Sequence, residues 1–411
     1  MQGHRSRLPL AVLAAVVAAG AATWLLRPRS GHIEPEPVAA TAYFSHEQLE
    51  RAHDFRDTQR LLGLAGLVVS GGTLTFLVVR PPRLLDRIGR RPLLGGGAAG
   101  AGISLVLVAV GLPLAAVAHN RAVDVGLSTQ SWGRWLGDTG KAAAIEAVFA
   151  AGGAAVGLGL ARRFRRNWWA PAAVCVVAVG VASLWLFPVV IDPVFNRFDR
   201  LPPGKLRSEV LSLANRAGVD VGQVYRVDAS RRTTGANAYV NGLGHTKRVV
   251  LYDTLIDSFP DDQVRSVVAH ELGHQKHRDL YRGLAWLALV APAGVFLAQA
   301  LAERIGRRQG LADPGRKPGP AALPALALSL AVVSFALGIA SNVLSRQVEA
   351  SADVFSLRLT QDPAAQIALE RRLALSNVAD PDPPKLLQLL FGTHPTTVER
   401  IGIGEAWARQ R

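Results

Sequence analysis

Long apolar runs constrain this chain more than any other feature. Seven stretches of roughly 20 residues carry few or no charges, and a helix needs about 20 apolar residues to cross the roughly 30 Å hydrocarbon core of a bilayer. They lie at about 8–26, 61–79, 93–118, 142–161, 170–191, 280–302 and 321–343. The sequence therefore predicts a mainly α-helical, multi-pass membrane protein with about seven transmembrane helices. The alternative for the first run is a signal peptide, which its length and the runs that follow disfavour.

The basic charge of the chain is distributed as expected for a membrane protein. A net charge of +15 can indicate nucleic-acid binding, but here the arginines cluster in short loops between apolar runs rather than along one helix face. Such clusters set membrane orientation, so nucleic acid is excluded as a partner and membrane lipid is expected. The Ala-, Arg- and Gly-rich composition suggests a bacterial plasma membrane. The single cysteine, Cys175, excludes a disulfide framework or a cysteine zinc site within one chain.

The apolar runs divide the chain into four parts. Residues 1–191 hold five spans, with Trp132 and Trp135 in an interfacial loop before the fourth of them. Residues 192–279 are polar in character, residues 280–343 hold the last two spans and a basic linker, and residues 344–411 are polar again. The two polar parts predict a small α+β domain outside the bilayer.

The first polar part begins with a helix and short strands. Apolar residues at helical spacing run from Lys205 to Ala217, and Gly218 ends them. Three short strands are expected at 223–229, 236–241 and 247–252, with a turn at 242–245. The second of these strands could bind an extended peptide at a free sheet edge, or could be half of a plain structural hairpin. The pattern alone does not separate these two interpretations.

The polar segment ends in the motif His270-Glu271-x-x-His274. Residues four apart share one face of a helix, so His270 and His274 can bind one tetrahedral metal ion. Glu271 is offset from that face and can act as general base on a metal-activated water. The alternative is a solvated helix face with two ordinary histidines, which the apolar lead-in and the uncharged interior of the motif disfavour. The segment therefore predicts a zinc helix that carries its own base.

A catalytic zinc site takes a third protein ligand and keeps a position open, and His, His and Glu is a recurring set. Glu349 is the candidate, on the helix that continues from the seventh span. Asp353 lies one turn later on the same face and can accept the second ring proton of a ligating histidine. The alternative for both acids is a solvated face on which Arg346 pairs with either one.

These residues together resemble the type I CAAX prenyl endopeptidases, integral-membrane gluzincin metalloproteases similar to the a-factor-converting enzyme. The resemblance covers nearly the whole chain, including its seven spans. It is carried by His270-Glu271-x-x-His274, by Asn342-x-x-Ser345-Arg346-x-x-Glu349-x-x-Ala352-Asp353, by His394-Pro395 with Arg400, and by Asn237-Ala238-Tyr239.

The resemblance implies roles for individual residues. One Zn²⁺ would be held by His270, His274 and Glu349, with Glu271 as base and with Asp353, Asn342 and Arg346 around the ligands. Asn237, Ala238 and Tyr239 would form a substrate-binding edge, and His394 and Arg400 would lie near the scissile bond or the product carboxylate. From the mechanism, His394 is also the candidate donor to the oxyanion. A barrel of membrane helices would enclose the site.

The expected function is zinc-dependent hydrolysis of peptide bonds in a peptide or protein substrate. No residue identifies a prenyl group, so general turnover of membrane or misfolded proteins is the alternative within enzymes. A zinc-stabilised scaffold without activity is the alternative outside them, and Glu271 argues against it because a scaffold needs no base.

The charge rule and the resemblance disagree about orientation. The basic loops place the catalytic part on the outer side of the membrane, whereas the resemblance implies the cytoplasmic side. Because four loops share the basic bias, the sequence favours the outward orientation, and a reporter fused to the C-terminus would test it.

Overall fold

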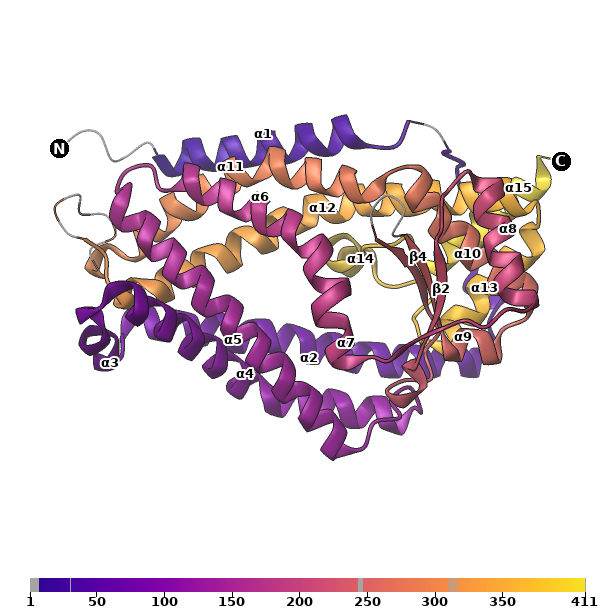
Figure 1. Cartoon of the computed structure of the whole chain (residues 1–411), viewed down its shortest axis with the longest axis horizontal. Coiled ribbons are helices and arrows are strands. Elements are labelled where there is room, and N and C mark those ends of the chain that lie inside the picture. The colour runs from indigo at the N-terminus through magenta and orange to yellow at the C-terminus, as the bar shows by residue number, and fades with distance from the viewer. Residues whose placement is uncertain are drawn as a thin grey trace.

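The fold is known from a computed structural model that describes residues 7–29, 31–242, 247–309, 311, 313, 315 and 317–410, apart from the side chain of Arg90. The molecule is elongated, with long helices along its length and a small sheet with short helices gathered at one end (Figure 1). The first described helix, α1, begins at one end of this long axis, and the last one, α15, lies at the other. The membrane part and the polar part predicted from the sequence are therefore separated along one direction.

Seven helices among the described residues are long and apolar enough to cross a membrane, which confirms the predicted fold class. They are α1 (Arg7–Leu26), α2 (His46–Val79), α4 (Pro92–Asp124), α5 (Trp132–Arg163), α6 (Trp169–Leu186) with its extensions, α11 (Asp279–Ile305) and α12 (Leu323–Thr360). The short helices α3 (Arg83–Arg87), η1 (Ala40–Ala42), η2 (Ile88–Arg90), η6 (Arg307–Gln309) and η7 (Pro320–Ala322) connect them.

Small residues allow two of these helices to pack closely. A side chain at Gly100 of α4 would lie 2.5 Å from the carbonyl oxygen of Ala150 in α5, which no real side chain tolerates. Contact between backbones of this kind is what small residues provide in a membrane, where lipid leaves no hydrophobic force between helices. The absence of a side chain at Gly100 therefore allows α4 and α5 to approach to backbone contact.

Two details of the spans differ from the prediction. Trp132 and Trp135 were expected in a loop, but both lie in the first turn and a half of α5, where their rings pack against His119 of α4. The fifth span ends in a π-helical turn, η3 (Phe187–Ile191), followed by α7 (Asp192–Phe195). Pro188 lies inside this turn and cannot donate a helical hydrogen bond, which accounts for the irregularity.

The polar end contains a four-stranded mixed sheet of order β1-β2-β4-β3. Its strands are β1 (Phe198–Arg200), β2 (Gln223–Val227), β3 (Ala238–Asn241) and β4 (Arg248–Tyr252). The last three confirm the predicted strands in slightly shorter form, and β1 was missed because three residues are too few to show an alternating pattern. The turn predicted at 242–245 lies largely outside the described residues.

Short helices cover the sheet and complete the domain. They are α8 (Lys205–Ala217), η4 (Ala229–Arg231), α9 (Asp253–Ser258), α10 (Asp261–Lys276), α13 (Pro363–Ser376), α14 (Lys385–Phe391) and α15 (Thr397–Arg409). As predicted, α8 ends at Gly218, whose φ of 66° is left-handed. The fully buried side chains of Val249, Leu251 and Leu272 belong to one core between the sheet, α8 and α10, and this core holds α10 in place.

The helix α12 joins the two parts of the molecule. It runs for 38 residues without a break, so its first half lies among the spans and its second half packs on α10. The preceding span, α11, begins directly after α10, at a turn in which Arg278 has a left-handed φ of 56°. The helix with the two histidines is thus fixed by elements that rise out of the membrane.

Candidate active site

The two histidines of α10 direct one ring nitrogen each to the same point. His270 and His274 lie one helical turn apart, and their Nε2 atoms are 3.2 Å from each other. Two neutral imidazoles at this separation cannot both direct lone pairs inward without a cation between them. The helical spacing read from the sequence therefore produces a site that a positive ion would stabilise.

Glu349 of α12 faces this pair from the opposite side. One carboxylate oxygen lies 3.2 Å from Nε2 of His270, and the other lies 3.6 Å from Nε2 of His274. Glu349 follows His270 by 79 positions in the sequence, and the two side chains meet because α12 packs along α10. Two nitrogens and a carboxylate thus converge from two helices.

The outer nitrogen of each histidine is held by an acid. Asp353 accepts at 2.8 Å from Nδ1 of His270, as expected for the residue one turn beyond Glu349. Asp279 accepts at 3.0 Å from Nδ1 of His274 and was not predicted. The chain turns after α10 at Arg278, whose φ is left-handed, and this turn places Asp279, the first residue of α11, beside His274.

Arg400 of α15 connects two buried acids behind His270. Its Nε donates to Asp353 at 2.9 Å, and its Nη1 lies 3.0 Å from the carboxylate of Glu370 in α13. Asp353 and Glu370 are 1% and 3% exposed, so each needs this partner. The resemblance implied that Arg400 lies near the scissile bond or the product carboxylate. Its guanidinium lies 3.4 Å from Nδ1 of His270 and lines a hollow of about 90 Å³ beside Glu271 and His394, and the expected contact with substrate stays a prediction. Glu370 was missed because nothing in the sequence separates it from the other acids of amphipathic helices.

Glu271 lies beside the histidine pair. One atom of its carboxylate and one nitrogen of each histidine lie within 4.8 Å of one another. Burial raises its pKa above the usual value, and the two histidines act in the opposite direction. A carboxylate in this position is suited to receive and release a proton.

His394 lies at the open side of the site, on the segment after α14. Its Nε2 is 3.4 Å from a carboxylate oxygen of Glu349, and its Nδ1 lies 2.9 Å from the hydroxyl of Thr393. The ring is half exposed, and partial burial lowers its pKa. It is therefore a neutral imidazole at the mouth of the site near neutral pH.

The donor atoms fit a divalent metal ion. Burial alone would lower the pKa of His270, but hydrogen bonds to Asp353 and Glu349 raise it to about 10. Similarly, hydrogen bonds to Asp279 and Glu349 outweigh burial and raise the pKa of His274 to about 9. Carboxylates that attract protons to both rings will equally attract a cation that replaces those protons, with the outer nitrogens already held as ligating histidines require.

A cleft of about 770 Å³ leads to these residues, lined by Glu271, His274, Glu349, His394 and the residues from Asn237 to Gly242. Here β3 is the edge strand of the sheet. The backbone N–H of Tyr252 in β4 donates to Asn237, so in antiparallel register the backbone groups of Ala238 and Val240 point away from β4. The edge predicted at Asn237, Ala238 and Tyr239 therefore borders this cleft, with the Ala238 N–H donating to Asn237 Oδ1 at 2.9 Å. Its role in binding substrate stays a prediction.

Two predicted neighbours of the ligands lie elsewhere. Asn342 donates to the carbonyl of Leu390 at 2.9 Å, and Arg346 donates to that of Gly392 at 2.6 Å. Within the described part of the chain, Arg346 forms no ion pair with Glu349 or Asp353. Both side chains point from α12 to α14 and hold the segment that carries His394, so they support that segment rather than the metal ligands.

Comparison with known proteins decides the family. Residues 201–407, half of the chain, match peptidase family M48, and residues 101–197 match the CAAX prenyl protease N-terminal domain with five membrane helices. The chain belongs to peptidase family M48. This M48 protein is therefore a metalloendopeptidase embedded in a membrane by several helices, and the resemblance seen in the sequence is confirmed.

Individual relatives agree with this assignment. An uncharacterized metalloprotease of Bacillus subtilis, YhfN, is 34% identical over 301 residues, which cover 73% of this chain and 70% of that protein. A CAAX prenyl protease 1 homolog of rice is 31% identical over 54% of this chain, which spans about half of the rice protein (52%). The crystal structure of S. mikatae Ste24p has the same fold, with a TM-score of 0.75 over 97% of this chain and 98% of that chain at 20% identity.

Proposed function

We propose that this M48 protein is a zinc endopeptidase with one Zn²⁺ per chain, held by His270, His274 and Glu349. The observation that carries the proposal is the convergence of the two Nε2 atoms and the Glu349 carboxylate, with both Nδ1 atoms held by acids. A set of two histidines and one carboxylate suits Zn²⁺ and leaves its fourth position open.

Glu349 is a better third ligand than Glu271. Its two carboxylate oxygens lie 3.2 Å and 3.6 Å from the two Nε2 atoms, so one ion can contact all three groups. Glu271 follows His270 directly on α10 and is rotated by about 100° around the helix axis. That offset leaves its carboxylate beside the ion and free to move a proton.

When bound, zinc supplies Lewis acidity, which makes water nucleophilic near neutral pH and polarises a carbonyl group. Glu271 takes a proton from the attacking water and passes it to the leaving amine, so one carboxylate acts first as base and then as acid. Its raised pKa suits both transfers, since a base with a very low pKa would hold the proton too weakly.

His394 is the donor to the oxygen on which negative charge develops. The Thr393 hydroxyl lies 2.9 Å from Nδ1, and donation from it would leave the ring proton on Nε2, directed to the ligand cluster. A neutral N–H in this position stabilises the oxyanion without adding a positive charge beside the metal. Arg400 acts on the opposite side, where it positions His270 through Asp353.

The edge of β3 holds the substrate as an extended strand. Backbone groups of Ala238 and Val240 face the cleft. A peptide that added to β3 as a further strand would place one of its peptide bonds beside the proposed zinc ligands and Glu271. Gln275 of α10 donates to the carbonyl of Val240 at 3.1 Å, which fixes this edge relative to the histidines. The position of this edge strand on the cleft, beside Glu271 and the three proposed ligands, favours a substrate site over the plain hairpin that the sequence allowed.

The substrates we propose are extended peptide segments of membrane or membrane-bound proteins. Several relatives are named CAAX prenyl protease 1, so prenylated peptides are the first lipid-modified class to test here. The cleft residues show no feature that would demand a prenyl group, and unmodified peptides are therefore included in the proposal.

Cleavage of a quenched-fluorescence peptide library by the purified protein in detergent tests the function. We expect cleavage that a zinc chelator abolishes and added Zn²⁺ restores, with one equivalent of zinc measured per chain. Zinc bound without cleavage of either plain or prenylated peptides would contradict the endopeptidase proposal, and cleavage that survives removal of all metal would contradict the zinc site.

A further inference from the structure

A second hollow lies outside the catalytic cleft, where two spans leave the membrane part. Its volume is about 330 Å³, and it is lined by the first turns of α5, by α7 and the residues after it, and by η4. The other side of the η3–α7 segment borders the catalytic cleft through Phe187, Pro188 and Asp192, so this segment separates the two hollows.

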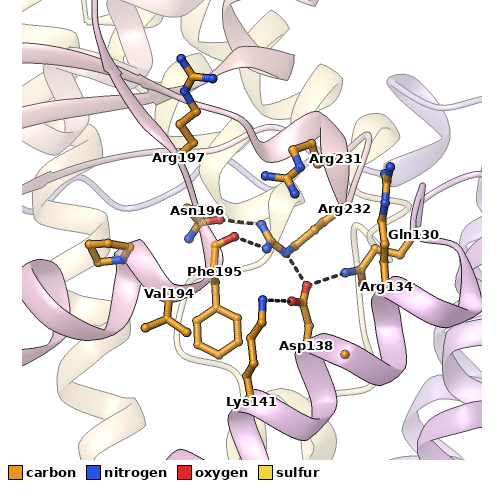
Figure 2. A pocket seen from close by; sticks show the side chains of 12 residues that line it. Gln130, Arg134, Asp138, Lys141, Val194, Phe195, Asn196, Arg197, Arg231 and Arg232 are labelled. Atoms are coloured by element: carbon orange, nitrogen blue, oxygen red, sulfur yellow. Dashed lines mark hydrogen bonds and ion pairs between the residues drawn. The ribbon is translucent and has the colours of Figure 1, made fainter.

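Basic side chains dominate the wall of this hollow. It is lined by Arg134, Lys141, Arg197, Arg231 and Arg232, with Asp138 as the acid among its lining residues (Figure 2). Asp138 accepts from Arg232 at 2.9 Å and from Lys141 at 3.1 Å. One carboxylate is thus shared by two cations, as Figure 2 shows.

The other basic side chains of the hollow can still form hydrogen bonds to a bound anion. Arg231 pairs with Asp228 at 2.8 Å, and Arg197 pairs with Asp199 at 3.1 Å, but these two side chains are 55% and 74% exposed. Among the residues that the structure describes, none forms an ion pair with Arg134. Even when Asp199 and Asp228 are counted, the hollow has a net charge of +2, and its arginines can bind an anion with paired N–H groups.

Apolar side chains continue from this hollow toward the membrane. On α5, Val148 lies two helical turns beyond Lys141 and on the same side of the helix. Phe149 lies three turns beyond Asp138, again on the same side of the helix. Val148 and Phe149 are 72% and 42% exposed. On the other wall, Val194 lines the hollow and is 43% exposed, and Val190 lies one turn deeper and is 44% exposed. A basic end is therefore continuous with two uncovered apolar strips.

We propose that this hollow binds the phosphodiester headgroup of an anionic phospholipid, with its acyl chains along the exposed apolar faces of α5 and the α6–α7 segment. Basic side chains next to exposed apolar ones favour a phospholipid over a soluble phosphate ion. A phosphate ion would contact only the basic side chains and would leave the apolar side chains uncovered. Trp132 and Trp135 in the same first turns of α5 mark the level at which headgroups lie. This site is independent of the proposed zinc chemistry.

A bound lipid would brace the wall of the catalytic cleft. The headgroup would contact residues of α7 on one side, while the same short segment borders the cleft on the other. Anionic lipid is therefore expected to stabilise the η3–α7 segment, whose π-helical turn gives it an irregular hydrogen-bond pattern.

The test measures the thermal midpoint of the purified full chain in neutral detergent during titration with phosphatidylglycerol, phosphatidylcholine or inorganic phosphate. The test variant is Arg134→Ala combined with Arg231→Ala, since both side chains are exposed. The matched control is Arg163→Ala, an exposed arginine at the other end of the same helix. Peptide cleavage without added lipid checks that all variants are folded.

We expect phosphatidylglycerol to raise the thermal midpoint of the wild-type protein far more than phosphatidylcholine does. The double variant should need roughly tenfold more phosphatidylglycerol, since each basic group near the headgroup contributes to the attraction, and Arg163→Ala should behave as the wild-type protein does. Equal responses to the two lipids, an unchanged double variant, or an equal loss in the control would overturn the proposal. Displacement of the lipid by millimolar inorganic phosphate would show a soluble-anion site instead.

Discussion

The membrane part and the catalytic part of this protein are built on opposite distributions of polarity. In the spans, large apolar side chains such as Val68 and Val148 are 74% and 72% exposed, because lipid replaces water as their surroundings. In the catalytic part, charged side chains such as Asp353 and Glu370 are almost completely buried. Among the described residues, the buried carboxylates Asp253, Asp353 and Glu370 all lie in the part that carries the candidate site. The two parts of one chain are thus adapted to two different surroundings, lipid and water.

Pairing makes the buried charges tolerable. Burying an isolated ion costs several kcal/mol, and a partner must offset that cost. Asp353, Glu370 and Arg400 form one cluster in which a single guanidinium contacts two carboxylates. The spans instead depend on helix formation and on close contact between small residues, so the two parts should respond to substitution in different ways.

The largest effect is expected at the base. Glu271→Gln removes the carboxylate that moves the proton and keeps its size, so peptide cleavage should fall by about 10³-fold while the metal content stays at the wild-type level. The measurement is cleavage rate with metal analysis of the same sample. Glu50→Gln, at an exposed carboxyl of α2, is the matched control and should change neither. Wild-type activity of Glu271→Gln would refute its role.

Arg400→Ala should lower stability by about 3 to 5 kcal/mol, because it leaves the buried Asp353 carboxylate without its counter-charge and the buried Glu370 carboxyl group without its partner. The free energy of unfolding, or the shift of the thermal midpoint in detergent, measures this loss. Metal affinity should also fall by about 10- to 100-fold, since Asp353 then holds His270 less firmly. A variant with wild-type midpoint and metal affinity would show that the cluster is not a positioning device.

The raised pKa of Glu370 predicts that the stability of the folded protein depends on pH. Burial raises its pKa to about 7 although Arg400 acts to lower it, whereas the unfolded chain titrates near its ordinary value of about 4.3. Between these values the folded protein holds a proton that the unfolded chain releases, so stability should fall as pH rises through this window, by about 4 kcal/mol at most.

Glu370→Gln should remove this part of the pH dependence, because glutamine does not titrate. Thermal midpoints of the wild-type protein and the variant at pH 5.5 and pH 8 measure the difference. Parallel shifts in the two proteins would show that Glu370 stays ionised in the folded state over the whole range.

The smallest effects compare one substitution in the two surroundings. Val249→Ala in β4 removes two methyl groups from a side chain that is 0% exposed, and it should cost about 2 kcal/mol. Val68→Ala removes the same groups from a side chain of α2 that is 74% exposed and should cost less than about 0.5 kcal/mol. Equal losses in thermal midpoint would mean that Val68 is covered, for example by a second copy of the chain.

Much of the fold could be predicted from short-range patterns. The apolar runs gave the spans because about 20 residues must be uncharged to cross a bilayer, and Gly218 ended α8 where a left-handed residue is needed. The boundaries of α5 and of the fifth span could not be predicted in this way. Trp132 and Trp135 suit a loop and a helix start equally well, and the π-helical turn before α7 has no periodic signature.

The sequence by itself determined the spans, the helix that carries His270 and His274, and the candidate ligands, because a helix fixes the geometry of residues four apart and the bilayer fixes a length. Only the tertiary structure decided which distant acids hold those ligands. Asp279 reaches His274 through a left-handed turn, and Arg400 reaches Asp353 and Glu370 through the packing of α15 against α12 and α13. Contacts of this kind depend on how helices cross, and no local pattern encodes a crossing.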